Sequence, residues 1–226
     1  MLLQLPNVLN GDQVEHIRDQ LEQSEWVDGR VTAGYQSSLV KRNRQLPESH
    51  PTSKKLGEII VVSLEKMDLF LSAALPLLVF PPLFNRYETG DGFGSHVDNA
   101  IRQISGTHHR IRTDLSMTIF LSQPEEYDGG ELVVEDNYGV HKVKLQAGSA
   151  ILYPASSIHL VQPVTRGIRL ASFSWIQSMV RDDGQRAILL DLDLSIQRLR
   201  ADYPDDPTAV HLTQVYNNIL RQWAEL

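Results

Sequence analysis

The chain of 226 residues predicts a mainly β fold with flanking helices. Short segments rich in β-branched and aromatic residues follow one another through the middle of the chain, separated by Gly, Pro, Asp and Asn, which is typical of a sandwich, jelly roll or barrel. Apolar residues recur at helical spacing towards both ends. We therefore expect an N-terminal helical or mixed support region (1–80), a β core (81–178) and a C-terminal helical region (179–226).

The N-terminal region predicts two helices. The first carries Val14, Ile17 and Leu21 on one face, and Asn10 and Gln13 are spaced to cap its start. A second apolar stripe at helical spacing is formed by Ile60, Leu64, Met67 and Leu71. Residues 29–46 lack a helical period and predict a short strand and loops. The apolar run 71–84 predicts a helix end followed by a buried strand, because it is too short to span a bilayer and is interrupted by prolines.

The β core and the C-terminal region complete the prediction. The expected strands cover 114–122, 130–136, 141–145, 149–154, 158–164 and 168–176. Two amphipathic helices follow, one around residues 188–199 and one around 212–223, separated by the turn 202–207. We expect a C-terminal helical hairpin that packs on the β core or on another subunit, and its apolar faces make a homo-oligomer a reasonable expectation.

Composition excludes several classes of protein. With 28 acidic and 21 basic residues the net charge is -7, which argues against a nucleic-acid-binding protein. The chain has no cysteine, so disulfides, thiolate metal sites and cysteine nucleophiles are excluded. The first ten residues show no signal-peptide pattern, and no stretch predicts a membrane span. We therefore expect a cytoplasmic protein without a nucleic-acid or membrane partner.

His96 and Asp98 stand two positions apart in the stretch "SHVDN" (95–99). Alternate side chains of a strand face the same way, so both could reach one metal ion. The pair could equally be a surface accident or a structural polar pair. A metal site needs a third ligand, and the candidates are the other histidines: His16, His50, His108, His109, His141, His159 and His211.

His159 fits the third position best. It begins a predicted strand after the turn "PASS" and lies 61 residues (159 − 98) beyond Asp98, which leaves room for several antiparallel strands between them. Two histidines and one carboxylate leave the opposite side of a metal open, an arrangement typical of non-haem Fe(II). Zn(II) also accepts these ligands, so the ligand types alone do not choose the metal.

Arg169 follows ten residues (169 − 159) after His159. A hairpin of residues 157–164 and 168–176 around the turn "TRG" would place it on the strand beside His159. Its neighbours are apolar, and an unpaired guanidinium is costly there. Because the guanidinium fork binds a carboxylate through two hydrogen bonds, its partner is either a protein acid or a dicarboxylate cosubstrate whose other end chelates the metal.

Several longer stretches carry a family resemblance. They are "NRYETGDGFGSHVDNA", "RTDLSMTIFLS", "YDGGELVVED" and "LYPASSIHLVQPVTRGIRLASFSWIQS". Together with the spacing of His96, Asp98, His159 and Arg169, they resemble the Fe(II)- and 2-oxoglutarate-dependent dioxygenases of the prolyl-hydroxylase type. More narrowly, the chain is similar to the bacterial PKHD-type hydroxylases, and the likeness extends over essentially the whole chain.

The resemblance implies a double-stranded β-helix, or jelly roll, as the dioxygenase core in 81–178. It implies that His96, Asp98 and His159 bind Fe(II) and form the catalytic centre, and that Arg169 binds the distal carboxylate of 2-oxoglutarate. Tyr87 matches a tyrosine that often hydrogen-bonds this carboxylate, although a tyrosine packed inside the barrel explains the position equally well. L-Ascorbate, which keeps the iron reduced in related enzymes, is a further expected cofactor.

The implied reaction is the hydroxylation of an unidentified small-molecule or peptide substrate, with release of succinate and CO2. Some relatives are encoded beside outer-membrane iron-uptake receptors, which favours a link to iron uptake. Two alternatives stay open from the residues themselves. A cupin-like sensor would bind the metal and 2-oxoglutarate without catalysis, and a zinc hydrolase would use the same three ligands but has no use for Arg169.

Several other residues could have either a functional role or a purely structural one. The loop 99–113, with His108 and His109, could border the substrate entrance or be a solvated connection, and we favour the second slightly. Its basic residues are Arg102, Arg110 and Arg112. They could attract an anionic substrate or simply lie in solvent, and Arg112 could pair with Asp114. We expect Gly129 and Gly130 to form a turn. We expect His141 to be a surface or core residue, and Trp175 to be a core residue on the same strand face as Arg169.

Overall fold

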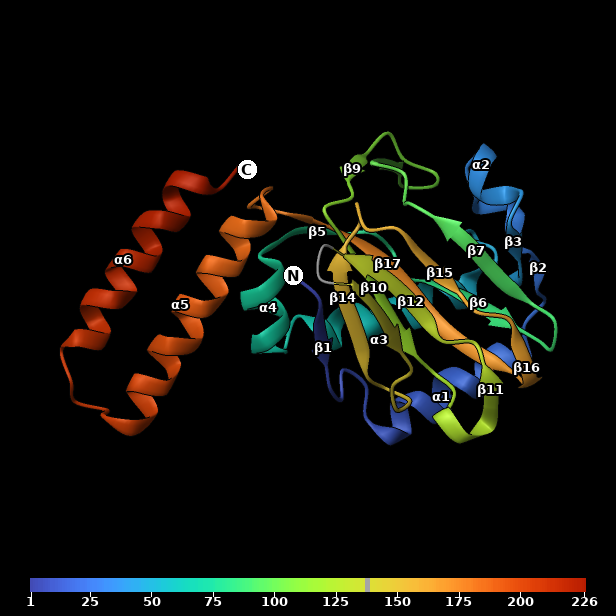
Figure 1. Cartoon of the computed structure of the whole chain (residues 1–226), viewed down its shortest axis with the longest axis horizontal. Coiled ribbons are helices and arrows are strands. Elements are labelled where there is room, and N and C mark those ends of the chain that lie inside the picture. Colours follow the sequence, from blue (N-terminus) through green and yellow to red (C-terminus); the bar gives the residue numbers. More distant parts are fainter. Residues whose placement is uncertain (137–138) are drawn as a thin grey trace.

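Two antiparallel sheets face each other in the computed structural model, which describes residues 1–136 and 139–226. The large sheet has the strand order β1 (Leu3–Leu5), β14 (Ala150–Pro154), β10 (Leu115–Phe120), β17 (Arg169–Ser178), β6 (Leu83–Tyr87), β4 (Arg44–Gln45) and β2 (Val27–Asp28), and β5 (Pro76–Val79) also pairs with β17. The small sheet has the order β13 (Gly139–Val143), β12 (Leu132–Asp136), β15 (His159–Val161), β7 (Gly92–His96) and β3 (Lys41–Arg42). This arrangement confirms the predicted mainly β fold with a jelly-roll core (Figure 1).

Two strand pairs lie outside the main sheets. β11 (Tyr127–Gly129) pairs with β16 (Val164–Gly167), and β8 (Ile101–Gln103) pairs with β9 (Arg110–Arg112). The second pair occupies the segment 99–113 that was interpreted as a solvated connection. The segment is therefore a small hairpin, whose residues are mostly exposed but whose Ile111 and Arg102 turn inward.

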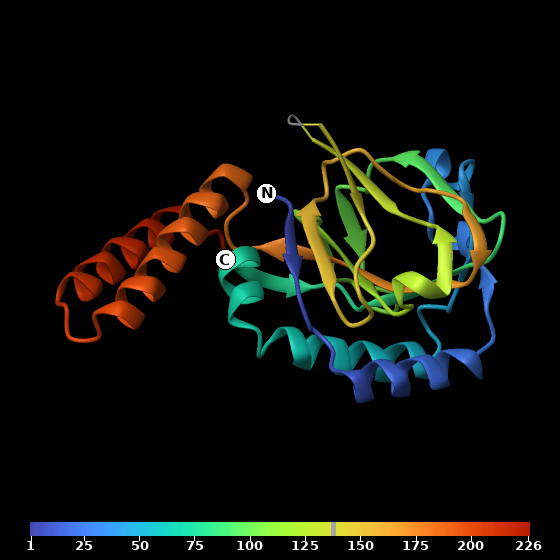
Figure 2. The same cartoon turned by 60° about the horizontal axis from the view of Figure 1, so that its bottom comes forward.

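Helices cover the outer face of the large sheet. Figure 2 shows α1 (Gly11–Glu22) and α3 (Pro51–Leu64) side by side beneath it. The remaining helical elements are α2 (Tyr35–Ser38), α4 (Asp68–Ala74), α5 (Asp183–Asp202), α6 (Thr208–Trp223) and the 3-10 turns Gly29–Thr32 and Pro124–Glu126.

β10 separates two cores by the alternation of its side chains. Leu115, Met117 and Ile119 pack with the helices in the outer core, whereas Phe120 packs with side chains of both sheets in the inner core. Ser116 and Thr118 share the inner face with Phe120 and line the pocket between the sheets. Because successive side chains of a strand point to opposite faces, a fully buried strand can supply apolar atoms to one core and polar groups to a site.

The second predicted helix is wrong in its extent. Ile60 and Leu64 lie in α3 and are fully buried, but the helix ends at Leu64. Met67 has an extended backbone and precedes α4, which begins at Asp68, where an acidic side chain suits the positive end of a helix. Leu71 therefore belongs to another helix, and 37% of its surface is exposed.

The expected single buried strand within 71–84 is also corrected. β5 is only partly buried and pairs with the far end of β17, whereas the buried β6 begins at Leu83, and Pro81 and Pro82 lie between the two strands. Proline lacks the N–H that a sheet ladder needs, so the chain leaves the sheet at this point and re-enters it.

The predicted hairpin that would place Arg169 beside His159 does not form. β15 ends at Val161, two residues before Pro163, and stays in the small sheet. β16 then pairs with β11, and β17 joins the large sheet. Pro163 cannot donate to a ladder, and the chain crosses from one sheet to the other. Arg169 therefore lies on the sheet opposite His159.

The C-terminal residues form the predicted helical hairpin. α5 contacts α4 and α6, and Figure 1 shows that the hairpin extends away from the two sheets. Leu189 of α5 is buried with Leu75 and Val180, and Tyr216 and Trp223 of α6 pack against this cluster. The hairpin is thus attached through α4 rather than laid across a sheet face. None of the helices in the described ranges is both long and apolar enough to cross a membrane.

The start of α1 generates a stability prediction. Asn10 accepts a hydrogen bond from the Gln13 backbone N–H (2.9 Å), and the Gln13 side chain accepts from the Asn10 N–H (2.9 Å), which confirms the predicted capping box. Asn10→Ala should lower the free energy of unfolding by about 1 kcal/mol in urea denaturation. Asn10→Asp, which retains the acceptor, should keep most of the wild-type stability, and equal losses in both variants would contradict a capping role.

Candidate metal centre and its pocket

The pairing of β7 with β15 brings His96 and His159 together. His96 lies opposite His159, and Phe93 lies opposite Val161. Between these two pairs β7 advances by three residues and β15 by two, so β7 contains one extra residue. This bulge turns Phe93 and His96 to the same face, and their rings stack with centroids 3.6 Å apart. Bulges commonly re-aim a side chain next to an active site.

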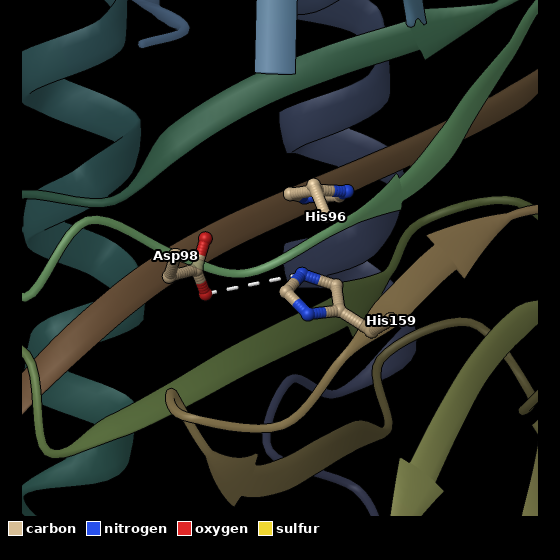
Figure 3. Close-up of side chains that lie close together, drawn as sticks. All are labelled: His96, Asp98 and His159. Atoms are coloured by element: carbon tan, nitrogen blue, oxygen red, sulfur yellow. Dashed lines mark ion pairs between the residues drawn. The ribbon is translucent and has the colours of Figure 1, made fainter. Parts of the chain in front are cut away.

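Asp98 completes a cluster with the two histidines. It lies just beyond the end of β7, so the expectation that both residues of the pair belong to one strand holds only for His96. One ligand atom from each of His96, Asp98 and His159 lies within 4.8 Å of the others. Figure 3 shows the three side chains converging, with the Asp98 carboxylate 3.8 Å from His159 Nε2.

Hydrogen bonds fix which nitrogen of each ring is available. His96 Nδ1 lies 2.8 Å from the Gly94 carbonyl oxygen, and His159 Nδ1 lies 3.0 Å from the Ser157 carbonyl oxygen. A carbonyl oxygen only accepts, so Nδ1 carries the proton in each ring and Nε2 keeps its lone pair. Ser116 donates a hydrogen bond to the Asp98 carboxylate. Such outer partners orient metal-binding side chains.

His96 is held in the neutral form that a metal ligand requires. Burial, together with the charge of the nearby His159 ring, lowers the pKa of His96 to about 4. Phe93 covers one face of the ring, and Tyr153 lies edge-on to His159 with centroids 5.2 Å apart. At neutral pH His96 therefore presents a neutral imidazole to the cluster.

The remaining histidines lie apart from this cluster. Among the described residues, the metal-binding group contains only His96, Asp98 and His159. His141 hydrogen-bonds Asp136 at the surface (3.0 Å), in agreement with its predicted surface or core role, and His50 accepts the Thr52 N–H at the start of α3. His108 and His109 are exposed in the β8–β9 hairpin.

Arg169 is enclosed between the two sheets with only 1% of its surface exposed. It lies directly opposite Tyr87 in the register of β17 and β6, and its guanidinium carbon lies 5.2 Å from the Tyr87 ring and 5.3 Å from the Phe120 ring. Within the described ranges, nothing accepts a hydrogen bond from its Nε or Nη2. An uncompensated buried guanidinium is costly, and these two nitrogens form one edge of the fork that binds a carboxylate.

Tyr87 links Arg169 to the metal-binding pocket. Its side chain lines the pocket that also contains the triad, and it is 1% exposed. Burial raises the pKa of the Tyr87 hydroxyl, an effect that the Arg169 charge opposes. The phenol therefore remains protonated at neutral pH and is a hydrogen-bond donor.

Tyr127 is a site residue that the sequence did not indicate. Its hydroxyl is buried beside the Arg169 guanidinium, whose positive charge opposes the rise that burial causes in the pKa of Tyr127. Gly130 adopts a φ of +67°, as its predicted turn role requires, and a Cβ there would lie 3.0 Å from the Tyr127 ring and 3.1 Å from Arg169 Cδ. The missing side chain thus leaves room for both groups. The pairing of β11 with β16 brings Tyr127 close to Arg169. The spacing of the residues in the sequence does not reveal this pairing.

The basic residues of 99–113 have three different positions. Arg102 lines the pocket, Arg110 is exposed, and Arg112 pairs with Asp114 (2.7 Å) as predicted, and with Glu225 (2.9 Å). Trp175 is 7% exposed and packs with Phe80, as expected for a core residue. It also lines the pocket, which was not expected.

The jelly-roll core with two histidines and one carboxylate defines a metal-dependent oxygenase class, and comparisons with known proteins agree. Residues 82–177 match the 2OG-Fe(II) oxygenase superfamily, and residues 183–225 match the PKHD-type hydroxylase C-terminal domain. The chain is 57% identical to a PKHD-type hydroxylase of Saccharophagus degradans over 225 residues, covering 100% of both chains. It is 54% identical to the PKHD-type hydroxylase PiuC of Pseudomonas aeruginosa over 226 residues, again covering 100% of both.

Solved structures support the fold. A Pseudomonas putida prolyl-4-hydroxylase aligns with a TM-score of 0.54 at 19% identity, covering 78% of this chain and 92% of that one. HygX from Streptomyces hygroscopicus, with nickel, 2-oxoglutarate and hygromycin B bound, aligns with a TM-score of 0.52 at 16% identity, covering 79% and 84%.

The chain belongs to the PKHD-type hydroxylase family within the 2OG-Fe(II) oxygenase superfamily. It is therefore a 2-oxoglutarate-dependent dioxygenase, with Fe(II) and 2-oxoglutarate as its metal and cosubstrate.

The buried His96 generates a prediction about pH. Its pKa lies below its ordinary value of 6.5, so the unfolded chain takes up a proton at a higher pH than the folded protein does. The free energy of unfolding of the metal-free protein should therefore fall as the pH is lowered from about 6.5 towards 4. His96→Gln should remove part of this fall in urea denaturation series, whereas the exposed His109→Gln should not. An undiminished fall in His96→Gln would contradict the assignment.

Proposed function

We propose that His96, Asp98 and His159 hold the Fe(II) of this dioxygenase, and that Arg169, with Tyr87, binds the distal carboxylate of 2-oxoglutarate. The observation that carries this proposal is the convergence of one ring nitrogen from each histidine and the Asp98 carboxylate at one wall of the pocket. Bound Fe(II) and 2-oxoglutarate would supply the oxidising chemistry, which consumes O2: one oxygen atom enters succinate as 2-oxoglutarate loses CO2, and the other enters the hydroxylated substrate.

The donor set fits this metal. Each Nδ1 proton is held by a backbone carbonyl, so both histidines present Nε2 without a change of tautomer. The Ser116 hydroxyl restrains the Asp98 carboxylate. The three side chains come from β7, the residues that follow it, and β15, and the pocket that they line extends to Asn85 and Tyr87 of the large sheet, which leaves room for other ligands. A facial arrangement of this kind suits Fe(II), which must also accept oxygen and a cosubstrate.

The surroundings of Arg169 fit a dicarboxylate. Its Nε and Nη2 require acceptors, and an arriving carboxylate would satisfy both and neutralise the buried charge. The Tyr87 and Tyr127 hydroxyls lie close to the same guanidinium and would donate further hydrogen bonds. The aromatic rings of Tyr87 and Phe120 exclude water around the charge, which strengthens each of these interactions.

We further propose a cytoplasmic location and a role linked to iron uptake. The cysteine-free chain fits a reducing compartment, and the relatives encoded beside outer-membrane iron-uptake receptors favour the link to iron uptake. Cell fractionation tests the location. A deletion strain that grows like its parent in both iron-poor and iron-rich medium would contradict the role.

The proposed metal centre is tested by turnover. Purified protein with Fe(II), 2-oxoglutarate, oxygen and ascorbate, which we expect to keep the iron reduced, should form succinate slowly without added substrate. His159→Ala should abolish stable iron loading and succinate formation, because only two ligands remain. His141→Ala is the matched control and should retain both. Full iron occupancy in His159→Ala, measured by metal analysis, would require a different third ligand.

The proposed carboxylate site is tested by Arg169→Met. Loss of charge-assisted hydrogen bonds should weaken 2-oxoglutarate binding roughly tenfold to hundredfold in anaerobic calorimetry. The ligand-free protein should unfold at the same or a higher denaturant concentration, because an unpaired buried cation has been removed. 2-Oxobutyrate, which lacks the distal carboxylate, should bind equally to both proteins. An equal loss for both 2-oxo acids would remove Arg169 from this role.

A further inference from the structure

Asn85 is a buried polar residue in the pocket that contains the metal-binding triad. It lies on β6 two residues before Tyr87, so both side chains point towards the small sheet, and both line the pocket. Asn85 is 8% exposed, and its Oδ1 atom is enclosed without a hydrogen-bond partner among the residues that the structure describes. An unpaired buried amide lowers stability, so its presence here requires a reason.

The neighbouring amide on the same sheet has an internal partner. Gln45 of β4 lies opposite Asn85, and its Oε1 atom accepts a hydrogen bond from Lys41 Nζ (3.1 Å). Lys41 comes from β3 of the small sheet and also lines the pocket. The fold thus supplies a donor to the Gln45 side chain, whereas the Asn85 carboxamide is left for a ligand.

The register of the large sheet places Asn85 between Arg169 and the triad. The next residue after Arg169 on the inner face of β17 is Ala171, which lies opposite Asn85. The same face continues along β17 to the level of Ser116 on β10, and Ser116 donates a hydrogen bond to Asp98. A molecule that reaches from Arg169 to the triad therefore passes the level of Asn85.

Asn85 is the polar side chain at this level of the large sheet. Ala171 projects only a methyl group from the sheet, with Asn85 on one side of it and Phe120 on the other. Because neither Ala171 nor Phe120 has a polar side chain, Asn85 alone among the three can form a side-chain hydrogen bond with a molecule that lies over the alanine.

The chemistry of the carboxamide suits a carboxylate. A carboxamide has one acceptor oxygen and two N–H donors, and a half-turn about its terminal torsion exchanges the positions of Oδ1 and Nδ2. An N–H group can therefore turn towards an arriving anion without a change in the backbone. A hydrogen bond to a charged acceptor is also stronger than one between neutral groups.

We propose that Asn85 donates a hydrogen bond to the C1 carboxylate of 2-oxoglutarate and so holds the 2-oxo acid end of the cosubstrate at the metal centre. This inference rests on the proposed function, in which Arg169 binds the distal carboxylate. Arg169 and Asn85 then recognise the two ends of the cosubstrate separately, and Asn85 contributes to the binding of a 2-oxo acid whatever its distal group.

Asn85→Leu tests the proposal, because leucine has nearly the shape of asparagine but forms no side-chain hydrogen bond. Binding of 2-oxoglutarate and of 2-oxobutyrate to the Fe(II)-loaded protein is measured by calorimetry without oxygen. Asn85→Leu should weaken the binding of both acids by the same factor, roughly tenfold. Arg169→Met, in contrast, should weaken the binding of 2-oxoglutarate alone.

A second variant and a matched control sharpen the result. Asn85→Asp keeps the shape of the side chain but places a carboxylate beside the C1 carboxylate, so it should bind both acids more weakly than Asn85→Leu does. Arg86→Gln is the control, because Arg86 points to the opposite face of β6 and pairs with Glu88 (3.0 Å). It should keep both wild-type affinities. Thermal unfolding confirms that each variant is folded, and metal analysis should show full iron occupancy in all of them.

An unchanged affinity for 2-oxoglutarate in Asn85→Leu, or in Asn85→Asp, would overturn the proposal. So would a loss confined to 2-oxoglutarate, because Asn85 would then act at the distal carboxylate. Incomplete iron loading of both variants would place Asn85 in the metal centre and would also overturn it. A wild-type protein that binds no 2-oxoglutarate would contradict the proposed function instead, and the two failures are therefore distinguishable.

Discussion

The candidate site depends on one irregular strand pair. β7 and β15 are joined antiparallel, and the extra residue in β7 sets Phe93 and His96 on one face, opposite His159. A regular ladder would turn one of these two side chains outward. The same pairing places the Gly94 and Ser157 carbonyls where they fix the Nδ1 protons. Ligand position and ligand tautomer thus follow from a single local register.

Buried charge is the second constraint, and it is distributed between the two sheets. The small sheet supplies His96, His159 and Lys41, and Asp98 follows the end of β7, whereas Arg169 comes from the large sheet. Each cation is placed among aromatic rings: Lys41 near Phe93 and Phe173, and Arg169 near Tyr87 and Phe120. Such rings attract cations weakly but do not replace a counter-ion. The surroundings of Arg169, whose Nε and Nη2 have no partner among the described residues, are therefore arranged to receive an anion.

The sequence predicted the clustering of His96, Asp98 and His159 better than it predicted their surroundings. His96, Asp98 and His159 could be grouped because ligand chemistry limits the candidates, and the fold class followed from many short strands with turn signals. The predicted position of Arg169 beside His159 was wrong, because the chain crosses to the other sheet at Pro163. Lys41 and Tyr127 were missed because β3 and β11 are two and three residues long and carry no period. Contacts that depend on tertiary pairing of such short segments leave no local pattern.

Metal ligands and Arg169 belong to opposite layers of the sandwich, and this has a consequence for selectivity. Facing sheets are separated by about 10 Å, a spacing set by the side chains packed between them, such as Phe120 and Leu132. That spacing determines how long a molecule must be to contact both layers at once. Under the proposed binding mode, in which one end of the cosubstrate lies at the triad and the other at Arg169, the side chains packed between the sheets would therefore set the length of 2-oxo acid that can contact both layers.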